Sequence, residues 1–434
     1  MTLFQTLVGA AACLALAGCT QLQMTTASQK LDGDPQAVPP VLGAFEDDAP
    51  VETLEDWTTR RAPLIKSALA RELYGPMPEG LTARVVERRV VDDAYAGGAG
   101  VLEEVTIALA DGPDAPAFNM ALALPNSALE GRPAPIIISQ NFCGNQGAMA
   151  SMDLSAPLPS AHSEGCAGNA FMGATARLIF GAHIMGGPME DILGRGYGMA
   201  AVFPSELIPD DSEAAPAALA KFAGLVTPGT EPEGALAVWA KAFSWSIDVL
   251  GDDPRIDPKR TAIWGHSRHG KSALLAAAHD TRIGATISHQ SGTGGATLTR
   301  SLNGESVKQI TDNYPHWFSP TYAEYADREA DIPVEQHQLI ALIAPRFVLI
   351  GNGWRDVWSD PNGAFRAMRG ADPVWELFGR EGLDQTGMKD ASTSGELFFH
   401  IRTGGHGVRK VDWRDFLDFL DRAFADVEIA DASD

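Results

Sequence analysis

The hydrophobic positions of this chain fall into two patterns that alternate along its length. One is a short, continuous apolar run, which is typical of a parallel strand buried on both faces. Such runs are PIIIS at 135–139, MAAVF at 199–203, TAIWG at 261–265, ATIS at 285–288, FVLIG at 347–351 and LFFHI at 397–401. The other pattern is helical spacing, which predicts a crossover helix with a buried aromatic face formed by Leu236, Trp239, Phe243, Ile247 and Leu250. The alternation predicts an α/β protein with a central, mostly parallel sheet.

Three more strands are predicted before the first of these runs. The pattern favours strands over residues 83–91, 101–109 and 118–124, separated by Gly-rich or Pro-rich breaks, after a helix over 54–73. Their close spacing indicates an antiparallel start to the sheet. No internal repeat or low-complexity block divides the chain. We therefore expect one domain over residues 46–427, followed by an acidic tail over 428–434.

The N-terminus has the features of a bacterial export signal. Its apolar run over residues 7–17 is too short to span a membrane as a helix. The sequence LAGC at 16–19 resembles a lipobox, in which the thiol of Cys19 is lipidated before cleavage. No Lys or Arg precedes the run, and an ordinary cleaved signal is the alternative. We expect a signal peptide over 1–18, a polar tether over 19–45, and an exported protein held by its lipid in the cell envelope, at the outer membrane or in the periplasm.

Composition and charge limit the classes of partner. The chain has 434 residues, of which 45% are hydrophobic, so a large core is possible and wholesale disorder is excluded. The 33 basic and 56 acidic residues give a net charge of −23, which disfavours a nucleic-acid or anionic membrane surface. We expect a monomer that binds no nucleic acid and meets the membrane only through its lipid anchor.

The cysteines are consistent with export. After cleavage removes Cys13 and acylation blocks Cys19, Cys143 and Cys166 remain in an oxidising compartment. These two residues can form a disulfide there. Two separate buried thiols are the alternative, because the sequence does not give the geometry that a disulfide needs.

The segment TAIWGHSRHGKSALLAAAHD at 261–280 is the sharpest chemical signal. It predicts a buried strand ending at Gly265, a tight turn that carries Ser267, and a helix beginning near His269. In such a turn the serine hydroxyl is exposed, while the helix N-terminus directs N–H groups at a reacting carbonyl. Gly270 lies one place later than the second glycine of the common G-x-S-x-G pattern. Ser267 is therefore the candidate nucleophile.

A serine hydroxyl needs a base and an orienting acid, which follow in the order serine, acid, histidine in α/β-hydrolases. His406 lies in the Gly-rich loop after the last predicted strand and is the candidate base. The loop after the 347–351 strand offers two acids, Asp356 and Asp360. We select Asp356, because Asp360 precedes Pro361 in a common turn-starting pair. Structural roles are expected for the other histidines considered, which are His266, His269, His279, His289, His316, His337 and His400.

Several blocks of the chain resemble one known family. They are GHSRHGKSALL, HQSGTGG, ITDNYPHWF, EQHQLIALIAPRFVLI and DVWSDPNG, and they are similar to the bacterial glucuronoyl esterases of carbohydrate esterase family 15. The similarity extends from about Trp57 to about Ala425. It implies an α/β-hydrolase fold, a three-layer sandwich, and cleavage of the ester between 4-O-methyl-glucuronic acid of glucuronoxylan and lignin alcohols. No metal or cofactor is implied, and no metal-binding motif occurs in the sequence.

The resemblance also assigns roles around the nucleophile. The family motif G-x-S-R-x-G-K places its serine on Ser267, its arginine on Arg268 and its lysine on Lys271. The backbone N–H of Arg268 would donate to the oxyanion, and its guanidinium would add positive charge there. Lys271, one helical turn beyond Ser267, would donate to sugar hydroxyls. Two surface cations at a helix start are the alternative, which the helix dipole disfavours.

Three further residues belong to the expected sugar site. By the resemblance, Glu305 would accept hydrogen bonds from uronate hydroxyls and Trp358 would line the site, with core packing as the alternative for Trp358. Gln290 stands where many family members carry a glutamate. A neutral amide cannot stabilise an imidazolium as a carboxylate can, so we expect Asp356 to be the acid and Gln290 a hydrogen-bonding neighbour in the substrate site.

Other functions remain open from the sequence alone. One is a different carbohydrate esterase, acting on acetylated xylan or on uronate methyl esters. Another is a carbohydrate-binding lipoprotein whose catalysis has decayed, with Gln290 as the symptom. The joint presence of Ser267, His406 and Asp356 argues against decay.

Overall fold

The computed structural model describes residues 38–112, 115–158, 180–301, 303–392 and 394–431. Within these residues one sheet has nine strands in the order β1-β2-β3-β5-β4-β6-β7-β8-β9. The strands are β1 (Arg84–Ala94), β2 (Gly100–Ala108), β3 (Ala117–Pro125), β4 (Ala134–Gln140), β5 (Gly198–Val202), β6 (Ile256–His266), β7 (Ala285–His289), β8 (Phe347–Gly353) and β9 (Leu397–Arg402). The strands β1, β2, β3 and β5 pair antiparallel, whereas all the remaining pairs are parallel. Every strand predicted from the sequence is present, and the predicted α/β-hydrolase fold with antiparallel N-terminal strands is confirmed.

Helices connect the strands and cover both faces of the sheet. The longer helices are α3 (Ala62–Leu69), α9 (Ala215–Ala223), α10 (Ala235–Leu250), α11 (Arg268–His279), α12 (Val307–Asn313), α15 (Pro361–Ala371) and α17 (Lys410–Asp431). The shorter helices are α2 (Leu54–Asp56), α4 (Tyr95–Gly98), α5 (Asn126–Leu129), α6 (Asn145–Ala148), α8 (Met189–Gly194), α13 (Pro320–Ala323), α14 (Gln336–Ala341) and α16 (Pro373–Leu377). The π-helical segments η1 (Trp57–Arg61) and η2 (Ala70–Tyr74) extend α3, and the 3₁₀ turns are η3 (Pro204–Glu206), η4 (Thr299–Ser301) and η5 (Glu329–Asp331).

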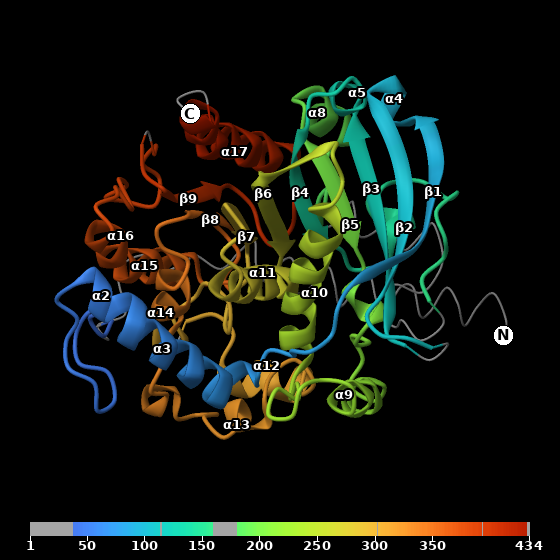
Figure 1. Ribbon diagram of the computed structural model, residues 1–434. Helices are drawn as coiled ribbons and strands as arrows, with labels where there is room; N and C mark the ends of the chain where they lie inside the picture. Colours follow the sequence, from blue (N-terminus) through green and yellow to red (C-terminus); the bar gives the residue numbers. More distant parts are fainter. Residues whose placement is uncertain (1–37, 113–114, 159–179, 302, 393, 432–434) are drawn as a thin grey trace, which may run out of the picture.

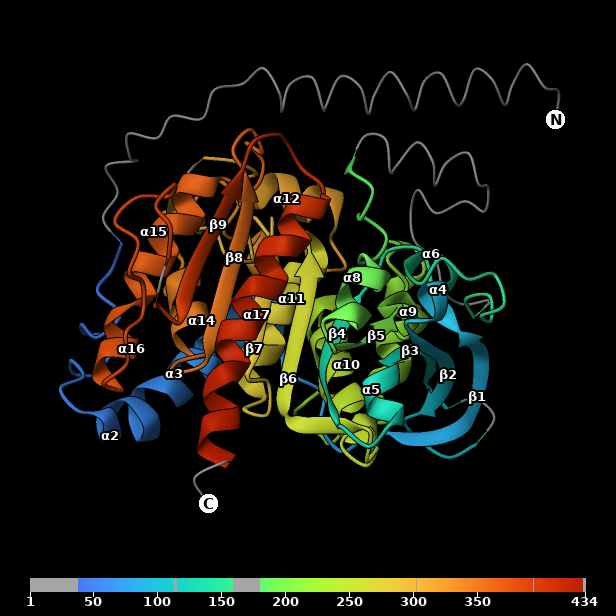
Figure 2. The same cartoon turned by 90° about the horizontal axis from the view of Figure 1, so that it is seen from above.

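Alternate residues of the central strands face two separate cores. Ile136 and Ile138 of β4 belong to the core that includes α3, α10, α11, α14 and α15. Ile137, between them, belongs to the core that includes α8 and α17. Figures 1 and 2 show α10 and α11 on one face of the sheet and α17 on the other. Because the central strands are buried on both sides, their sequences are continuous apolar runs, as the three-layer prediction requires.

The N-terminal segment is tied into the body earlier than predicted. Val41 and Phe45 are buried in the larger core, with exposures of 2% and 6%. The buried guanidinium of Arg61 donates to the carbonyl of Val41 and to the carboxylate of Asp48. The predicted tether over 19–45 therefore extends too far, because its last residues supply apolar side chains and a hydrogen-bond acceptor to the fold.

The C-terminal boundary also differs from the prediction. Helix α17 continues to Asp431, past the expected domain end at residue 427, so the backbone of residues 428–431 is helical rather than a frayed tail. The expected signal peptide and Cys19 lie outside the described residues. Cys143 is disulfide-bonded, and Cys166, its predicted partner, lies outside the described residues. Among the helices of the described part, none has the length and apolar character needed to cross a membrane.

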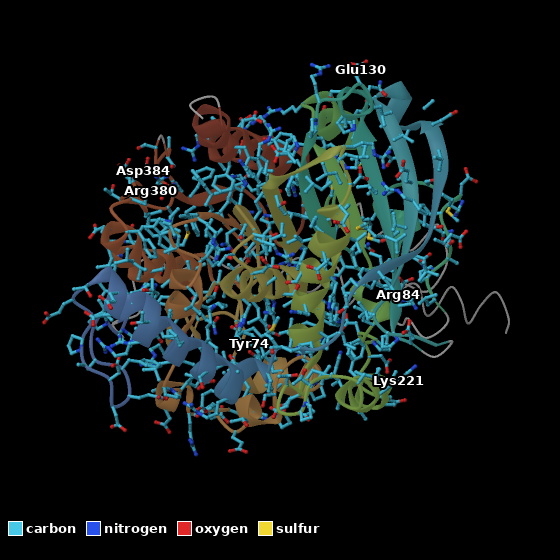
Figure 3. All side chains as sticks on the ribbon, in the orientation of Figure 1. Tyr74, Arg84, Glu130, Lys221, Arg380 and Asp384 are labelled. Carbon is cyan, nitrogen blue, oxygen red and sulfur yellow. The ribbon has the colours of Figure 1, made fainter. Side chains whose placement is uncertain are left out.

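The N-terminal helical segment supports a loop far away in sequence. It ends at Tyr74, which is labelled in Figure 3. The Tyr74 hydroxyl is buried, and its single proton is shared between the carbonyl of Gly294, at 3.0 Å, and the side-chain oxygen of Gln336, at 3.2 Å. Gly294 belongs to the loop that follows β7, so the first helices brace the edge of the sheet where the candidate residues lie.

Trp264 joins the sheet to α17 and gives a test of this packing. Its ring is 2% exposed and lies 5.0 Å from the ring of Trp413. We expect Trp264→Ala to lower the free energy of unfolding by about 3–5 kcal/mol, because a large buried ring is lost. The matched surface change Val86→Ala, at a side chain that is 56% exposed, should change it by about 0.5 kcal/mol or less. Urea unfolding curves of the two variants measure the difference, and equal midpoints would contradict the packing.

Candidate active site

Ser267 occupies a strained turn between β6 and α11. Its backbone has φ 55° and ψ −124°, a conformation that side-chain-bearing residues rarely adopt. The N–H of Ser267 donates to the carbonyl of His289 at 2.8 Å, which ties the turn to the end of β7. A side chain at Gly265 would place its Cβ 1.9 Å from the carbonyl oxygen of His269. The local sequence therefore permits a turn that holds the serine at the N-terminus of α11.

His406 and Asp356 are paired across the neighbouring loops. Nδ1 of His406 lies 2.7 Å from Oδ2 of Asp356, whose side chain is fully buried. Burial raises the pKa of Asp356, but the charge and N–H of His406, together with hydrogen bonds from Ser359, hold that pKa below its usual value. An ionised Asp356 fixes the proton of His406 on Nδ1 and leaves Nε2 free to accept a proton.

The alternative acid, Asp360, has a different task. Its side chain accepts the N–H of Gly363 at 3.1 Å and caps the start of α15. Its second oxygen accepts the hydroxyl of Ser301 at 2.5 Å. These bonds are the ones expected of a turn-starting aspartate, and they occupy both carboxylate oxygens of Asp360.

One cavity of about 390 Å³ collects the predicted residues. Its lining includes Ser267, Arg268, Lys271, Gln290, Glu305, Trp358 and His406, and Asp356 lies behind His406. The lining also includes residues to which the sequence analysis gave no role, namely Ser291, Gly292, Asn313, Tyr314, Trp317 and Ser359. Three of these, Asn313, Tyr314 and Trp317, belong to the ITDNYPHWF block. The aromatic and amide residues of this block are the sequence feature that could have indicated them as part of the site.

Arg268 is held by an acid and by aromatic rings. Its guanidinium forms an ion pair with Asp210, a buried residue that follows η3. Asp210 also accepts the indole N–H of Trp317 at 2.8 Å and lies 3.1 Å from Nε2 of His316. The guanidinium carbon lies within 4.8–5.5 Å of the ring centres of Phe142, Tyr314 and Trp317. The positive charge expected beside the serine is therefore present, but Asp210 balances part of it.

The buried Lys271 and the partly exposed Glu305 line the same cavity, where their opposite charges interact. Nζ of Lys271 donates to the carbonyl of Ser291 at 2.6 Å and to the carbonyl of Thr293. Two of its three donors are thus used by the protein, and one is left for a ligand. Burial raises the pKa of Glu305, although the charge of Lys271 opposes the shift. The N–H of Glu305 donates to the carbonyl of Trp358 at 3.2 Å, which places these two sugar-site candidates side by side.

Gln290 uses its side chain within the protein. The amide nitrogen donates to the carbonyl of Gly405 at 3.1 Å, and the amide oxygen accepts the N–H of Gly407 at 2.8 Å. The expectation of a hydrogen-bonding neighbour agrees with these contacts. Each end of the amide keeps a further hydrogen-bonding site and Gln290 lines the cavity, so the expectation of a substrate-binding side chain stays a prediction.

Comparisons with known proteins agree on one family. A family model described as glucuronyl esterase, fungi, matches residues 203–379. A carbohydrate esterase from an unknown prokaryotic organism is 32% identical over 385 residues, covering 86% of this chain and 87% of the relative. The chain belongs to the glucuronoyl esterases of carbohydrate esterase family 15.

Solved structures of this family have the same fold. A glucuronoyl esterase from Solibacter usitatus superposes with a TM-score of 0.77 at 32% identity, covering 91% of this chain and 99% of its own. A promiscuous family 15 esterase from the marine bacterial metagenome superposes with a TM-score of 0.78 at 29% identity, covering 91% and 100%. The resemblance that the sequence blocks indicated is therefore confirmed over nearly the whole chain.

A cluster of neutral histidines lies beneath His406 in this family 15 esterase. The ring of His266 lies 4.5 Å from that of His406, and Nδ1 of His266 lies 3.2 Å from Nδ1 of His289. Burial and the neighbouring charge of His406 hold the pKa of His266 well below its usual value, and burial lowers the pKa of His289 to about 3. Neutral rings at this place add no positive charge that would oppose protonation of His406.

Among the described residues, no group of three or more His, Cys, Asp or Glu side chains is arranged to hold a metal ion. Acidic residues that lie near histidines bind other protein groups instead. Asp412, for example, accepts from His400 at 2.7 Å and from Arg402 at 2.8 Å.

The buried charge of Lys271 predicts a pH effect on stability. Burial lowers the pKa of Lys271 from the ordinary 10.5 to about 8. Below pH 8 the lysine is protonated in both states, so the folded chain carries the full cost of burying the charge. As the pH rises from 8 to 10.5 the folded chain loses this proton first, and the cost is relieved.

We therefore expect the free energy of unfolding to rise relative to that of Lys271→Met, by up to about 3 kcal/mol over this interval. Urea unfolding of both proteins at a series of pH values measures the difference. A stability difference that stays constant with pH would show that the buried ammonium group pays no such cost.

Proposed function

We propose that the protein is a serine esterase that hydrolyses the ester between (4-O-methyl-)glucuronic acid of glucuronoxylan and the alcohols of lignin. Relatives named 4-O-methyl-glucuronoyl methylesterase include one from Schizophyllum commune, 25% identical over 357 residues. The observation that carries the proposal is the 2.7 Å pair of His406 and Asp356 beside the strained Ser267, in one cavity with Lys271 and Glu305.

Ser267, His406 and Asp356 carry the chemistry of the proposed reaction. Oγ of Ser267 attacks the ester carbonyl while Nε2 of His406 accepts the hydroxyl proton. The resulting tetrahedral intermediate collapses to an acyl-enzyme, and His406 returns the proton to the alcohol that leaves. Water, deprotonated by His406, then attacks the acyl-enzyme and releases the uronic acid and free Ser267. Asp356 holds the His406 tautomer and stabilises the imidazolium in both steps.

The N-terminus of α11 stabilises the negative charge of the intermediate in this proposal. Helix α11 begins at Arg268, directly after the nucleophile, so the backbone N–H of Arg268 and the helix dipole face the cavity. The Arg268 guanidinium, fixed by Asp210, adds a preorganised charge that does not have to reorient during the reaction.

Lys271, Glu305 and Trp358 recognise the uronate in this proposal. The remaining donor of Lys271 and the carboxylate of Glu305 offer complementary partners to vicinal sugar hydroxyls. Trp358 supplies an aromatic face for the C–H surface of the ring. Lys271 is buried, so a bound ester that lacks these hydroxyls leaves its remaining donor without a partner, and the site discriminates against such esters.

We also propose that the chain is exported and anchored through a lipid on Cys19, and that the anchored protein is a monomer. The lipobox-like sequence supports the anchor. The disulfide-bonded state of Cys143 supports an oxidising compartment outside the cytoplasm.

The substrate class is tested with three esters and one variant. We expect the protein to hydrolyse benzyl glucuronate in preference to benzyl galacturonate and to an aryl acetate, and Ser267→Ala to lose at least about 10³-fold in kcat. Release of benzyl alcohol measures the first two reactions. Cleavage of the acetate alone would keep the serine mechanism and reject the uronate, whereas cleavage of the glucuronate by Ser267→Ala would reject the nucleophile.

The acid is tested by a matched pair of asparagine variants. Asp356→Asn should lower kcat by about 10³–10⁴-fold, because the amide no longer fixes the His406 tautomer. Asp360→Asn should keep kcat within about twofold, because asparagine also caps a helix. Both side chains are fully buried, so steady-state kinetics on benzyl glucuronate compares two changes of equal size. Near-normal turnover of Asp356→Asn would show that another group serves as the acid.

A further inference from the structure

Gln290 lies where the three loops of the proposed triad meet. It directly follows His289, whose carbonyl accepts the N–H of Ser267 at 2.8 Å. The carbonyl of Gln290 accepts the hydroxyl of Ser359 at 3.1 Å, and Ser359 also contacts Asp356 through its N–H. The Gln290 backbone is thus connected both to the nucleophile turn and to the loop of the acid.

The side chain of Gln290 reaches the third loop and brackets His406. Its amide nitrogen donates to Gly405, the residue before His406, and its amide oxygen accepts from Gly407, the residue after it. Glycines on both sides give the histidine loop wide backbone freedom. Two hydrogen bonds of opposite polarity remove that freedom at the position that carries the base.

The backbone and the neighbouring residues of Gln290 restrict the position of its side chain. The residue is 1% exposed and adopts φ 50°, and its N–H donates to the carbonyl of Gly351 at 2.7 Å. A side chain at Gly353 would place its Cβ 2.8 Å from the amide nitrogen of Gln290 and 2.6 Å from the carbonyl oxygen of Gly405. A left-handed backbone at a non-glycine residue is costly and is retained where neighbouring contacts fix it.

We propose that Gln290 is a positioning residue that holds the imidazole of His406 in the position from which it contacts Asp356 and acts on Ser267. The inference rests on the proposed function of His406 as the base. An amide is required, because the hydrogen bonds to Gly405 and Gly407 need one donor and one acceptor on the same side chain. A carboxylate can accept the N–H of Gly407, but an ionised carboxylate repels the carbonyl oxygen of Gly405. In this chain the residue at position 290 therefore serves the histidine loop, and Asp356 alone supplies the negative charge to His406.

The test compares Gln290→Met with a matched control, Gln385→Met. Gln385 is also a buried glutamine whose amide bonds backbone groups, with its nitrogen on Phe399 and Asp390 and its oxygen on Phe399. Both variants lose comparable hydrogen bonds, so both should show a lower Tm. Only Gln290→Met should lower kcat on benzyl glucuronate, by about 10–100-fold, with KM changed by less than about twofold, because a displaced base slows chemistry and not binding. An unchanged kcat, or an equal loss in both variants, would overturn the proposal.

Gln290→Glu is the second variant and keeps the shape of the side chain. We expect its kcat to fall by about tenfold or more at neutral pH, because one of the two loop contacts becomes repulsive. A kcat equal to or above that of the unchanged protein would overturn the proposal, whether or not Gln290→Met folds. Ser267→Ala and His406→Ala test the proposed function separately. If both of these variants are inactive and Gln290→Met is fully active, the positioning role of Gln290 is rejected and the proposed function is kept.

Discussion

The parallel register of β6, β7, β8 and β9 is the constraint on which the site depends. His266, His289, Gly351 and His400 are aligned across these four strands. The chain leaves the sheet just beyond this row, so Ser267 and Gln290 follow it directly and the loops of Asp356 and His406 start from the same edge. Parallel strands place all their carboxyl ends on one side, and a row of residues aligned in this way brings distant parts of the sequence within hydrogen-bond distance.

Burial on both faces makes this edge rigid and also raises the free energy of the charged groups that lie there. The structure meets that cost by pairing each buried charge with a fixed partner. Asp356 has His406, Asp210 has Arg268, and Lys271 has backbone carbonyls together with the charge of Glu305. The histidines under the site stay neutral because desolvation lowers their pKa.

The side chain at position 290 affects the loop that carries His406. An ionised carboxylate at this position would accept the N–H of Gly407 but would repel the carbonyl oxygen of Gly405. The amide of this chain brackets that loop instead, and the buried Asp356 makes the direct contact with His406 at 2.7 Å. The neutral amide at position 290 is therefore compatible with the proposed catalysis, because Asp356 makes the contact that would orient the imidazole.

The sequence by itself determined the strands, the turn at Ser267 and the loops in which Asp356 and His406 lie. These features depend on local patterns: doubly buried strands are continuous apolar runs, and a strained turn needs small residues such as Gly265 at close backbone contacts. It also gave Asp360 a turn-starting role because Pro361 follows it, and the structure shows Asp360 capping α15.

Only the tertiary structure decided what lies around these residues. Several contacts join segments that are far apart in the chain. Asp210 pairs with Arg268, and Gln290 bonds to Gly405 and Gly407. Val41 and Phe45 are buried in the larger core. Such contacts leave no periodic pattern, since each depends on how loops pack after the sheet has formed. The chemistry of the chain is therefore visible in its local sequence, whereas the geometry that aligns it is fixed by contacts between its loops.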